Sequence, residues 1–547
     1  MPAKMPRLPA LRPLLATAVL VLGLGALTAS RIAVAADTQD YPAASLSAPT
    51  DPAALIARGK YLVTAADCMP CHTGPNHAPF SGGLVMQTPF GGLSTPNITP
   101  DKATGIGNWT DKQFYAALHD GISPGRSYLV FPKFLYPAMP YTSYTKLSYP
   151  DVMAIKAYLD SLAPVDAPRL PNSLKFPFNQ RPVLLGWRIL FFRSGPMHMN
   201  PAWDEQMKNG AYLTEALGHC GECHTPRNFM EAMIQSRAYA GAPIDNLFAP
   251  NISSDKAFGV GGWSQADLVA YLHDDGNIVK GSPYGAMGDM TDHSTSQLPI
   301  SDVQDIAIYL QTATKPQITP PGPAIADADA SIARGQSLYA TNCAGCHGAT
   351  GGGMGPNFVP NLAGNDSITA TLPYNPIGAM LGGLGSWAPN GPKMPAFGAQ
   401  FTDQQIADIT NYVRTAWGNK GSADATAADV MRLRGVGGLP PAASQAADKL
   451  GCPRISPFGG AGTVTDPGNG LLNIYDGAST AAVPSLTQKL IAALKASNSS
   501  ISNTDLTNTL VAAYCPVLAQ TPGMSLSGKR SALKDFIAAA QPLIAAH

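Results

Sequence analysis

Six of the eight cysteines in this 547-residue chain stand in three copies of one pattern: two cysteines separated by two residues and followed directly by a histidine. The copies are Cys68, Cys71 and His72; Cys220, Cys223 and His224; and Cys343, Cys346 and His347. Two thiols one helical turn apart can form thioethers with the vinyl groups of one haem, and the adjacent imidazole then binds the iron. The pattern therefore predicts three covalently bound haems c.

Two other uses of paired cysteines fit this sequence less well. A zinc site needs four ligands close together, whereas these pairs are far apart along the chain and each carries its own histidine. A thioredoxin-like redox pair needs alternating strands and helices, which the sequence lacks, and does not require the histidine. Haem attachment is the favoured interpretation of all three copies.

The residue on the opposite face of each iron decides what that iron can do. A methionine there closes the iron and suits electron transfer, whereas an open or histidine-ligated face allows other chemistry. Met394 stands before Pro395, seven residues ahead of Phe401, and Met139 stands before Pro140 at the equivalent place after the first copy. Because the same arrangement occurs twice, we expect both methionines to be sixth ligands.

The sixth ligand belonging to the second copy is less defined. Met287 and Met290 both lie upstream of Leu298, and neither is followed by proline. We prefer Met287, with Met290 as the alternative. An iron left open here would instead favour a multi-haem peroxidase or oxidase, and a free-standing electron shuttle is a further possibility. Three closed irons would leave no site for substrate, so no catalytic residue is predicted.

The elements that must position these residues also repeat. Each copy of the pattern ends a helical segment that begins near a glycine, namely Gly59, Gly210 or Gly335. A second segment follows downstream, with apolar residues recurring at intervals of three and four, as on one face of a helix. The first two copies share a further insert at a constant offset of 154 residues, which the third lacks. They are interpreted as a duplication with a shorter relative behind them.

The predicted fold is all-α, with short helices joined by long loops rich in glycine and proline. We expect three tandem cytochrome c-type domains at residues 36–170, 171–316 and 324–419, separated where proline and polar residues cluster. Residues 420–547 are expected to form a small, mainly helical region without a haem motif. Its Cys452 and Cys515 are predicted to form a structural disulfide.

Charge and the first residues indicate where the protein acts. Residues 1–35 resemble an export signal: basic residues precede an apolar run, and a small-x-small site ends the segment. Its loss would remove four basic residues and no acid, turning the balance of 36 bases and 36 acids into a net charge of −4. No basic stripe is present, so nucleic acid is not an expected partner. The apolar stretch 182–192 is too short to span a bilayer.

From about residue 54 to residue 418 the chain resembles the tri-haem cytochrome c subunits of membrane-associated periplasmic dehydrogenases. The best-known of these serves the quinoprotein alcohol dehydrogenase of acetic acid bacteria. The resemblance rests on the following segments: TPFG at 88–91, NITPD at 97–101, GIGNW at 105–109, YPAMPY at 136–141, GHCGECHTPR at 218–227, MPAF at 394–397 and NYVR at 411–414.

This resemblance implies haem attachment at the three motifs, with Met139, Met287 and Met394 as sixth ligands. It also implies electron flow from a quinoprotein, flavin or molybdenum dehydrogenase subunit to ubiquinone or a terminal oxidase. The implied location is the periplasm, in peripheral association with the outer face of the inner membrane. Two features depart from the family: residues 420–547 extend well beyond the expected short tail, and residues 125–136 are longer and more apolar than usual.

Overall fold

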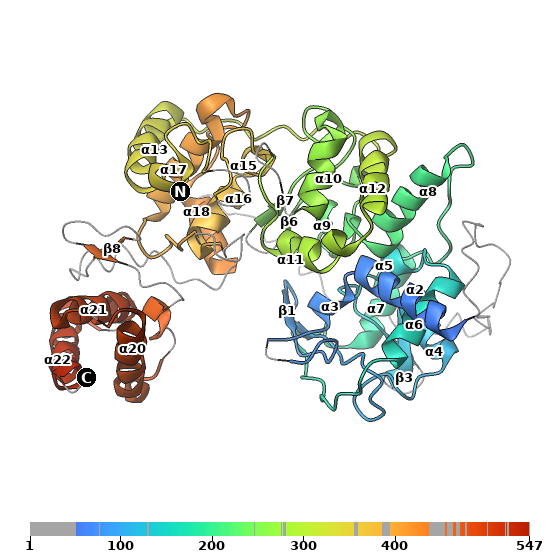
Figure 1. Cartoon of the computed structure of the whole chain (residues 1–547), viewed down its shortest axis with the longest axis horizontal. Coiled ribbons are helices and arrows are strands. Elements are labelled where there is room, and N and C mark those ends of the chain that lie inside the picture. Colours follow the sequence, from blue (N-terminus) through green and yellow to red (C-terminus); the bar gives the residue numbers. More distant parts are fainter. Residues whose placement is uncertain are drawn as a thin grey trace, which may run out of the picture. The chain divides into compact units, whose positions relative to one another are not determined.

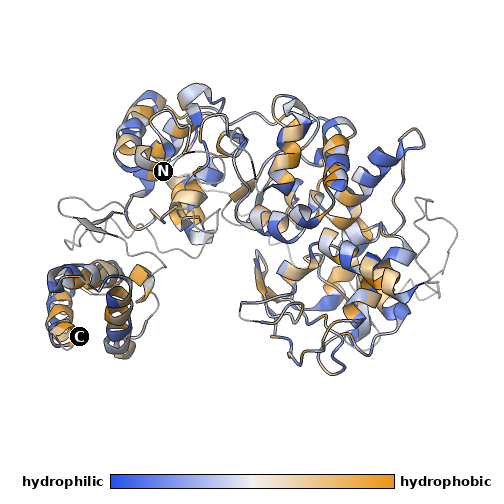
Figure 2. Ribbon diagram, viewed as in Figure 1, coloured by the Kyte–Doolittle hydropathy of each residue, from blue (hydrophilic) through white to orange (hydrophobic). Residues whose placement is uncertain are grey.

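The computed structural model describes most of the chain after residue 50. The described residues are 51–75, 77–127, 131–244, 247–274, 276, 280–354, 359–384, 394–436, 454–456, 463–465, 471–475, 478–499, 501–519, 521 and 524–545. Figure 1 traces their helices and strands along the chain. Along most helices, apolar residues (orange in Figure 2) alternate with hydrophilic ones (blue), as expected for helices with one buried face. The predicted export signal, residues 1–35, lies outside the described residues.

The first copy of the motif stands in a frame of two crossing helices. The helices of this part are α2 (Pro52–Ala65), α3 (Cys68–Cys71), α4 (Asp111–His119), α5 (Tyr141–Tyr144) and α6 (Tyr149–Asp160). Helix α2 packs against α6. Asp51 caps α2 by accepting a hydrogen bond from the Ala54 N–H, and Thr110 and Gln113 form a capping box on α4.

The second copy repeats this frame. Helix α8 (Glu205–Tyr212) continues into a π-helical turn (Leu213–Leu217) and packs against α12 (Ile300–Thr312). Between them come α9 (Gly221–His224), α10 (Gln265–His273) and α11 (Ala286–His293), and α7 (Leu184–Phe191) precedes α8.

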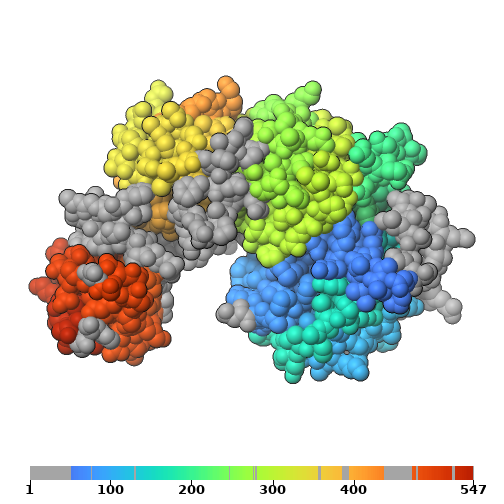
Figure 3. Space-filling view, viewed as in Figure 1, coloured from blue at the N-terminus to red at the C-terminus, as the bar shows by residue number. Residues whose placement is uncertain are grey.

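The third copy has the same frame, and a separate group of helices follows it. Its two framing helices are α13 (Ala328–Asn342) and α17 (Asp403–Thr415), which pack against each other. The other helices of this part are α14 (Ala344–His347), α15 (Asp366–Thr369), α16 (Tyr374–Gly382) and α18 (Ala427–Val436). The later helices are α20 (Val483–Ser497), α21 (Asn503–Ala519) and α22 (Leu526–Ala545), which share a core that includes Leu490, Leu510 and Phe536. Their surface is the red part of Figure 3.

The expectation of an all-α fold is wrong for the loops. Short strands occur in the described residues: β1 (Val85–Thr88), β2 (Gly91–Ser94), β3 (Ile122–Ser127), β4 (Phe131–Phe134), β5 (Ser173–Leu174), β6 (Ala242–Ile244), β7 (Leu247–Ala249), β8 (Arg454–Ser456) and β9 (Thr463–Thr465). The order β1-β2-β5 forms one antiparallel sheet, β3-β4 and β6-β7 are antiparallel pairs, and β8-β9 is parallel. Long loops satisfy their backbone N–H and C=O groups by pairing with one another once they fold back.

A glycine allows each pair of framing helices to touch. A methyl group at Gly59, Gly210 or Gly335 would lie 1.9–2.0 Å from a backbone carbonyl oxygen of the partner helix. Those oxygens belong to Ala154, Asp305 and Asp408 respectively. Only glycine permits so close an approach, which gives a physical reason for the repeated glycine.

The first two frames share one hydrophobic core. The cluster joins Leu62 and Leu147 of the first copy with Leu217 and Leu298 of the second, all at most 5% exposed. The third copy has its own core, which includes Tyr339, Ile377 and Ile406. No helix in the described ranges is both long enough and apolar enough to cross a bilayer.

Two matching hydrogen bonds join the first two copies. The Tyr61 hydroxyl donates to Asp302 at 2.7 Å, and the Tyr212 hydroxyl donates to Asp151 at 2.7 Å. Tyr61 and Tyr212 stand at equivalent positions of α2 and α8, and the two aspartates stand at equivalent positions of α6 and α12. The contact between the copies is therefore approximately symmetric, and each copy provides one donor and one acceptor.

Removing these two hydroxyls should weaken the contact between the copies. Tyr61→Phe and Tyr212→Phe should each reduce the free energy of unfolding by about 1–2 kcal/mol, because each removes a donor to one carboxylate oxygen, while Asn209 or Arg58 still donates to the other. Tyr149→Phe is the control, because this ring is 37% exposed, and its loss should stay within about 0.5 kcal/mol. Denaturant unfolding measures all three. Equal stability of all three variants would show that the hydroxyls do not join the copies.

Candidate functional site

Each motif occupies a single helical turn that breaks away from the helix before it. Cys68–Cys71, Gly221–His224 and Ala344–His347 are four-residue turns. Before the first two, the backbone turns sharply through a left-handed residue, Asp67 with φ 49° or His219 with φ 39°. A turn of this length sets the two cysteines of a pair on one side and places the histidine beside them. This is the spacing that attachment to a single haem requires.

The three motif histidines make the same hydrogen bond. Nδ1 lies 2.8 Å from the Pro96 carbonyl oxygen for His72, 2.7 Å from that of Pro250 for His224, and 3.2 Å from that of Pro360 for His347. A carbonyl oxygen only accepts hydrogen bonds, so Nδ1 must carry the hydrogen, and the Nε2 lone pair is left for a metal.

Burial also favours the neutral imidazole that a metal requires. It holds the pKa of His72, His224 and His347 below the usual histidine value. An imidazole with a fixed tautomer and a hydrogen-bonded far nitrogen is the typical arrangement of a metal-binding histidine.

The proline carbonyls were not identified from the sequence. Pro96 and Pro250 belong to the shared Pro-Asn-Ile segments, and Pro360 is followed by Asn361 in the third copy. A Pro-Asn pair at a modest distance after each motif was therefore available as a signal. The acceptor is a backbone atom, however, so no side-chain type indicates its role.

Four of the motif cysteines have a pKa above the usual value of a thiol. Burial is the main cause that raises the pKa of Cys68, Cys220 and Cys343 to about 12 and that of Cys71 to about 11. Cys68, Cys71, Cys220, Cys343 and Cys346 form no disulfide. Within the described part of the chain, no three histidine, cysteine, aspartate or glutamate side chains gather as a metal-ion site. The zinc alternative therefore finds no ligand set there.

The candidate sixth ligands all border a hydrophobic core. Met139, Met287 and Met290 pack against the core shared by the first two copies, and Met394 packs against the third. Met287 and Met290 lie on α11, where a spacing of three residues places them on one face. The Thr295 hydroxyl contacts the Met290 sulfur at 4.0 Å. The Thr295 hydroxyl donates its hydrogen to the Leu272 carbonyl oxygen, so this contact leaves the Met290 sulfur available and the choice between the two methionines stays open.

In the first two copies, the segment that carries or follows the candidate methionine lies against the motif of the other copy. Helix α11 contacts α3, which holds the first motif. Helix α5 follows Met139, and its Thr142 and Ser143 donate hydrogen bonds to Glu222, between the cysteines of the second motif. Each motif is thus bordered by the other copy, and the two candidate sites belong to one packed unit.

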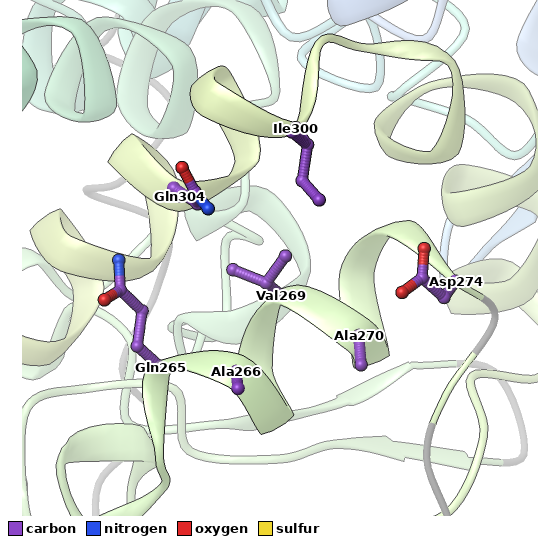
Figure 4. A pocket seen from close by; sticks show the side chains of 7 residues that line it. All are labelled: Gln265, Ala266, Val269, Ala270, Asp274, Ile300 and Gln304. Atoms are coloured by element: carbon purple, nitrogen blue, oxygen red, sulfur yellow. The ribbon is translucent and has the colours of Figure 1, made fainter.

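Two pockets differ in their relation to these sites. One of about 460 Å³ is lined by Gly221, Glu222 and Thr225 around the second motif and by Trp187 and Leu190 of α7. The other, of about 340 Å³, lies between α10 and α12 (Figure 4). It is lined by Gln265, Ala266, Val269, Ala270, Asp274, Ile300 and Gln304, none of which belongs to a motif. Only the larger pocket adjoins the candidate chemistry.

The structure describes one of the two cysteines of the expected disulfide. Cys515 lies on α21, is fully buried and is disulfide-bonded. Its predicted partner, Cys452, lies outside the described residues, so the pairing stays a prediction.

Comparison with known proteins identifies similar chains. The cytochrome c family pattern matches residues 332–417. The chain is 35% identical over 416 residues to the cytochrome c subunit of the quinone alcohol dehydrogenase of Komagataeibacter europaeus, covering 71% of this chain and 86% of the relative. It is 37% identical over 459 residues to the fructose dehydrogenase cytochrome subunit of Gluconobacter japonicus, covering 78% and 90%. For the gluconate 2-dehydrogenase cytochrome c subunit of Pantoea cypripedii, identity is 35% over 406 residues, covering 70% and 90%.

Proposed function

Because this chain belongs to the family of dehydrogenase cytochrome c subunits, we propose that it binds three haems c and relays electrons from a catalytic subunit. The donor is a periplasmic dehydrogenase subunit of quinoprotein, flavin or molybdenum type, and the acceptor is ubiquinone or a terminal oxidase. The chain itself is an electron-transfer subunit rather than a catalytic enzyme. The observation that carries the haem count is the proline-carbonyl hydrogen bond made by all three motif histidines.

The residues fit three haems, one at each motif. The six motif cysteines would hold the haems as thioethers, and His72, His224 and His347 would bind the irons through Nε2. Met139, Met287 and Met394 would close the opposite faces, which leaves no position for substrate. Bound haem supplies reversible one-electron exchange. The protein sets the ease of that exchange through the axial ligands, through burial, and through the proline carbonyls that fix the imidazoles.

The repeated frame supports three tandem cytochrome c-type domains. Each frame has two helices crossing at a glycine, a motif on a helical turn and a proline carbonyl behind the histidine. The proposed domains are residues 36–170, 171–316 and 324–419, and α18 from the following region packs onto the third. The shared core of the first two supports their acting as one unit with two attachment sites.

The proposed location is the periplasm, at the outer face of the inner membrane. The apolar run and small-x-small site in residues 1–35 support export, and haem attachment to this motif takes place outside the bacterial cytoplasm. The family resemblance supports peripheral membrane association.

Haem counting tests the proposed function most directly. The exported chain should contain three haems by pyridine haemochrome absorbance divided by protein concentration. The oxidised protein should show a sulfur-to-iron charge-transfer band with the amplitude of three methionine-ligated irons. Addition of the catalytic subunit and its substrate should reduce all three. Fewer than three haems would overturn the haem count, and an iron that binds peroxide or cyanide rapidly would favour the peroxidase alternative.

The choice between Met287 and Met290 is tested by a matched pair of variants. Met287→Ala should remove about one third of the charge-transfer absorbance, because one of three sulfur–iron bonds is lost. Met290→Ala removes the same side chain one helical turn away and should leave that absorbance unchanged. The reverse result would assign the ligand to Met290. If both variants kept the full band, neither methionine would be a ligand.

A further inference from the structure

Helix α7 (Leu184–Phe191) exposes an apolar face. Ile189 is 63% exposed and Leu190 is 61% exposed, with Val183 and Leu185 also exposed. Val183, Gly186 and Leu190 are spaced by three and four residues, and Leu185 and Ile189 are four apart, so these exposed residues lie on the outer side of the helix and of the turn before it. A surface helix normally presents polar residues on this side, and a helix that is apolar all round is normally covered.

The inner face of α7 is firmly held. The Trp187 indole donates to the Met230 carbonyl oxygen at 2.9 Å, and this ring is buried with Tyr141 and Phe192. The Arg188 guanidinium, the helix's single charge, lies over the Phe192 and Phe134 rings at 4.7 and 4.8 Å from their centroids. The outer apolar face is thus presented by a packed helix.

The segment around α7 is also basic. Residues 167–203 contain Arg169, Lys175, Arg181, Arg188 and Arg193 and no aspartate or glutamate, in a chain whose bases and acids are equal in number. None of the five forms an ion pair with a carboxylate in the described part of the chain. Arg169, Lys175 and Arg193 are exposed. The same segment exposes Phe176, at 80%, and Leu170.

We propose that this α7 surface docks on an anionic phospholipid bilayer. The α7 surface comprises Val183, Leu185, Ile189, Leu190 and Arg193, and the exposed Leu170, Phe176, Arg169 and Lys175 of the preceding segment are proposed to join it at the bilayer. Its apolar side chains enter the interface between headgroups and acyl chains, and its basic side chains meet the lipid phosphates. Eight residues are too few to span a bilayer, so α7 lies in the plane of the membrane. This inference deepens the proposed function by naming the surface that holds the subunit at the membrane.

A bilayer matches this surface better than a protein does. The outer face of α7 carries no polar side chain before Arg193, whereas the rim of a protein interface supplies polar groups for specific pairing. The basic residues of this surface donate to backbone or amide oxygens or to none, and no carboxylate of the described residues neutralises them, so they complement a surface of uniform negative charge. Docking here would also bring the 460 Å³ pocket, which Leu190 helps to line, close to the lipid phase.

Vesicle flotation of the haem-loaded full chain tests this proposal. The protein should float with vesicles of phosphatidylcholine and phosphatidylglycerol, less so with phosphatidylcholine alone, and less at high salt. Ile189→Glu combined with Leu190→Glu should lower the bound fraction about tenfold or more, because two side chains that enter the interface become charged. Ile300→Glu combined with Ile318→Glu alters two other exposed isoleucines and should leave binding unchanged.

Other measurements separate this proposal from the proposed function and from misfolding. The haem spectrum and thermal unfolding of the α7 variant should match those of the unaltered chain, as should its reduction by the catalytic subunit in solution. If the α7 variant floated as well as the unaltered chain, the membrane assignment would be overturned. A variant that keeps vesicle binding but no longer co-purifies with the catalytic subunit would assign the surface to that protein instead. Neither outcome would affect the haem count.

Discussion

Replacing Gly335 with alanine should reduce the free energy of unfolding of the third frame by about 2 kcal/mol or more. The added methyl group would lie 2.0 Å from the Asp408 carbonyl oxygen and 2.9 Å from the Tyr412 Cβ. Neither neighbour can move easily, because the Asp408 carboxylate accepts hydrogen bonds from Ser331 at 2.6 Å and from Arg334 at 2.7 Å. The two helices must separate, and overpacking of this kind costs about 1–3 kcal/mol before any core contact is lost.

The matched control variant, Gly435→Ala, is expected to increase the free energy of unfolding rather than reduce it. Gly435 lies on α18, which packs onto the same frame, and a methyl group there would meet nothing within 4 Å. Gly435→Ala should therefore raise stability by about 0.5–1 kcal/mol through helix propensity alone. Denaturant unfolding followed by haem absorbance measures both variants. If Gly335→Ala were as stable as Gly435→Ala, the close crossing of α13 and α17 would not explain this glycine.

The helical frame and the motifs could be predicted because their signals are local. A cysteine pair with its histidine spans five residues, and the apolar spacing of α6, α12 and α17 reports a buried helix face. The strands gave no such signal. In the β2-β5 pairing, Gly91 lies opposite Leu174, and the two are far apart in sequence with no alternating apolar run around either. Such pairing depends on where the loops meet after folding.

The relation between the first two copies is likewise set by tertiary packing. The sequence shows that Tyr61 matches Tyr212 and that Asp151 matches Asp302, but it does not show that each tyrosine binds the other copy's aspartate. Helix α7 illustrates the same limit. The sequence indicates that its apolar stretch is too short to span a membrane. Only the structure reveals that one face of the helix is exposed while Trp187 is buried.

Replacing Met394 should alter one haem and leave the fold intact. The thioether is proposed to be the sixth ligand of the third iron, where it stabilises the reduced state. Met394→His should remove about one third of the charge-transfer absorbance and lower the potential of one haem by on the order of 0.1 V or more. Potentiometric titration followed by absorbance would show one component shifted and two unchanged.

The surroundings of Met394 explain why the backbone should tolerate this change. The Met394 carbonyl oxygen accepts a hydrogen bond from the Leu384 N–H at 2.9 Å, and the Phe397 N–H donates to the Met380 carbonyl oxygen at 2.7 Å. Both bonds are made by backbone atoms, so they persist whatever side chain position 394 carries. Met354→Ala is the control, because this methionine of the same copy is 56% exposed, and it should change neither the band nor any potential. If Met354→Ala lowered a potential and Met394→His did not, the third iron would have its sixth ligand in the glycine-rich loop that follows its motif.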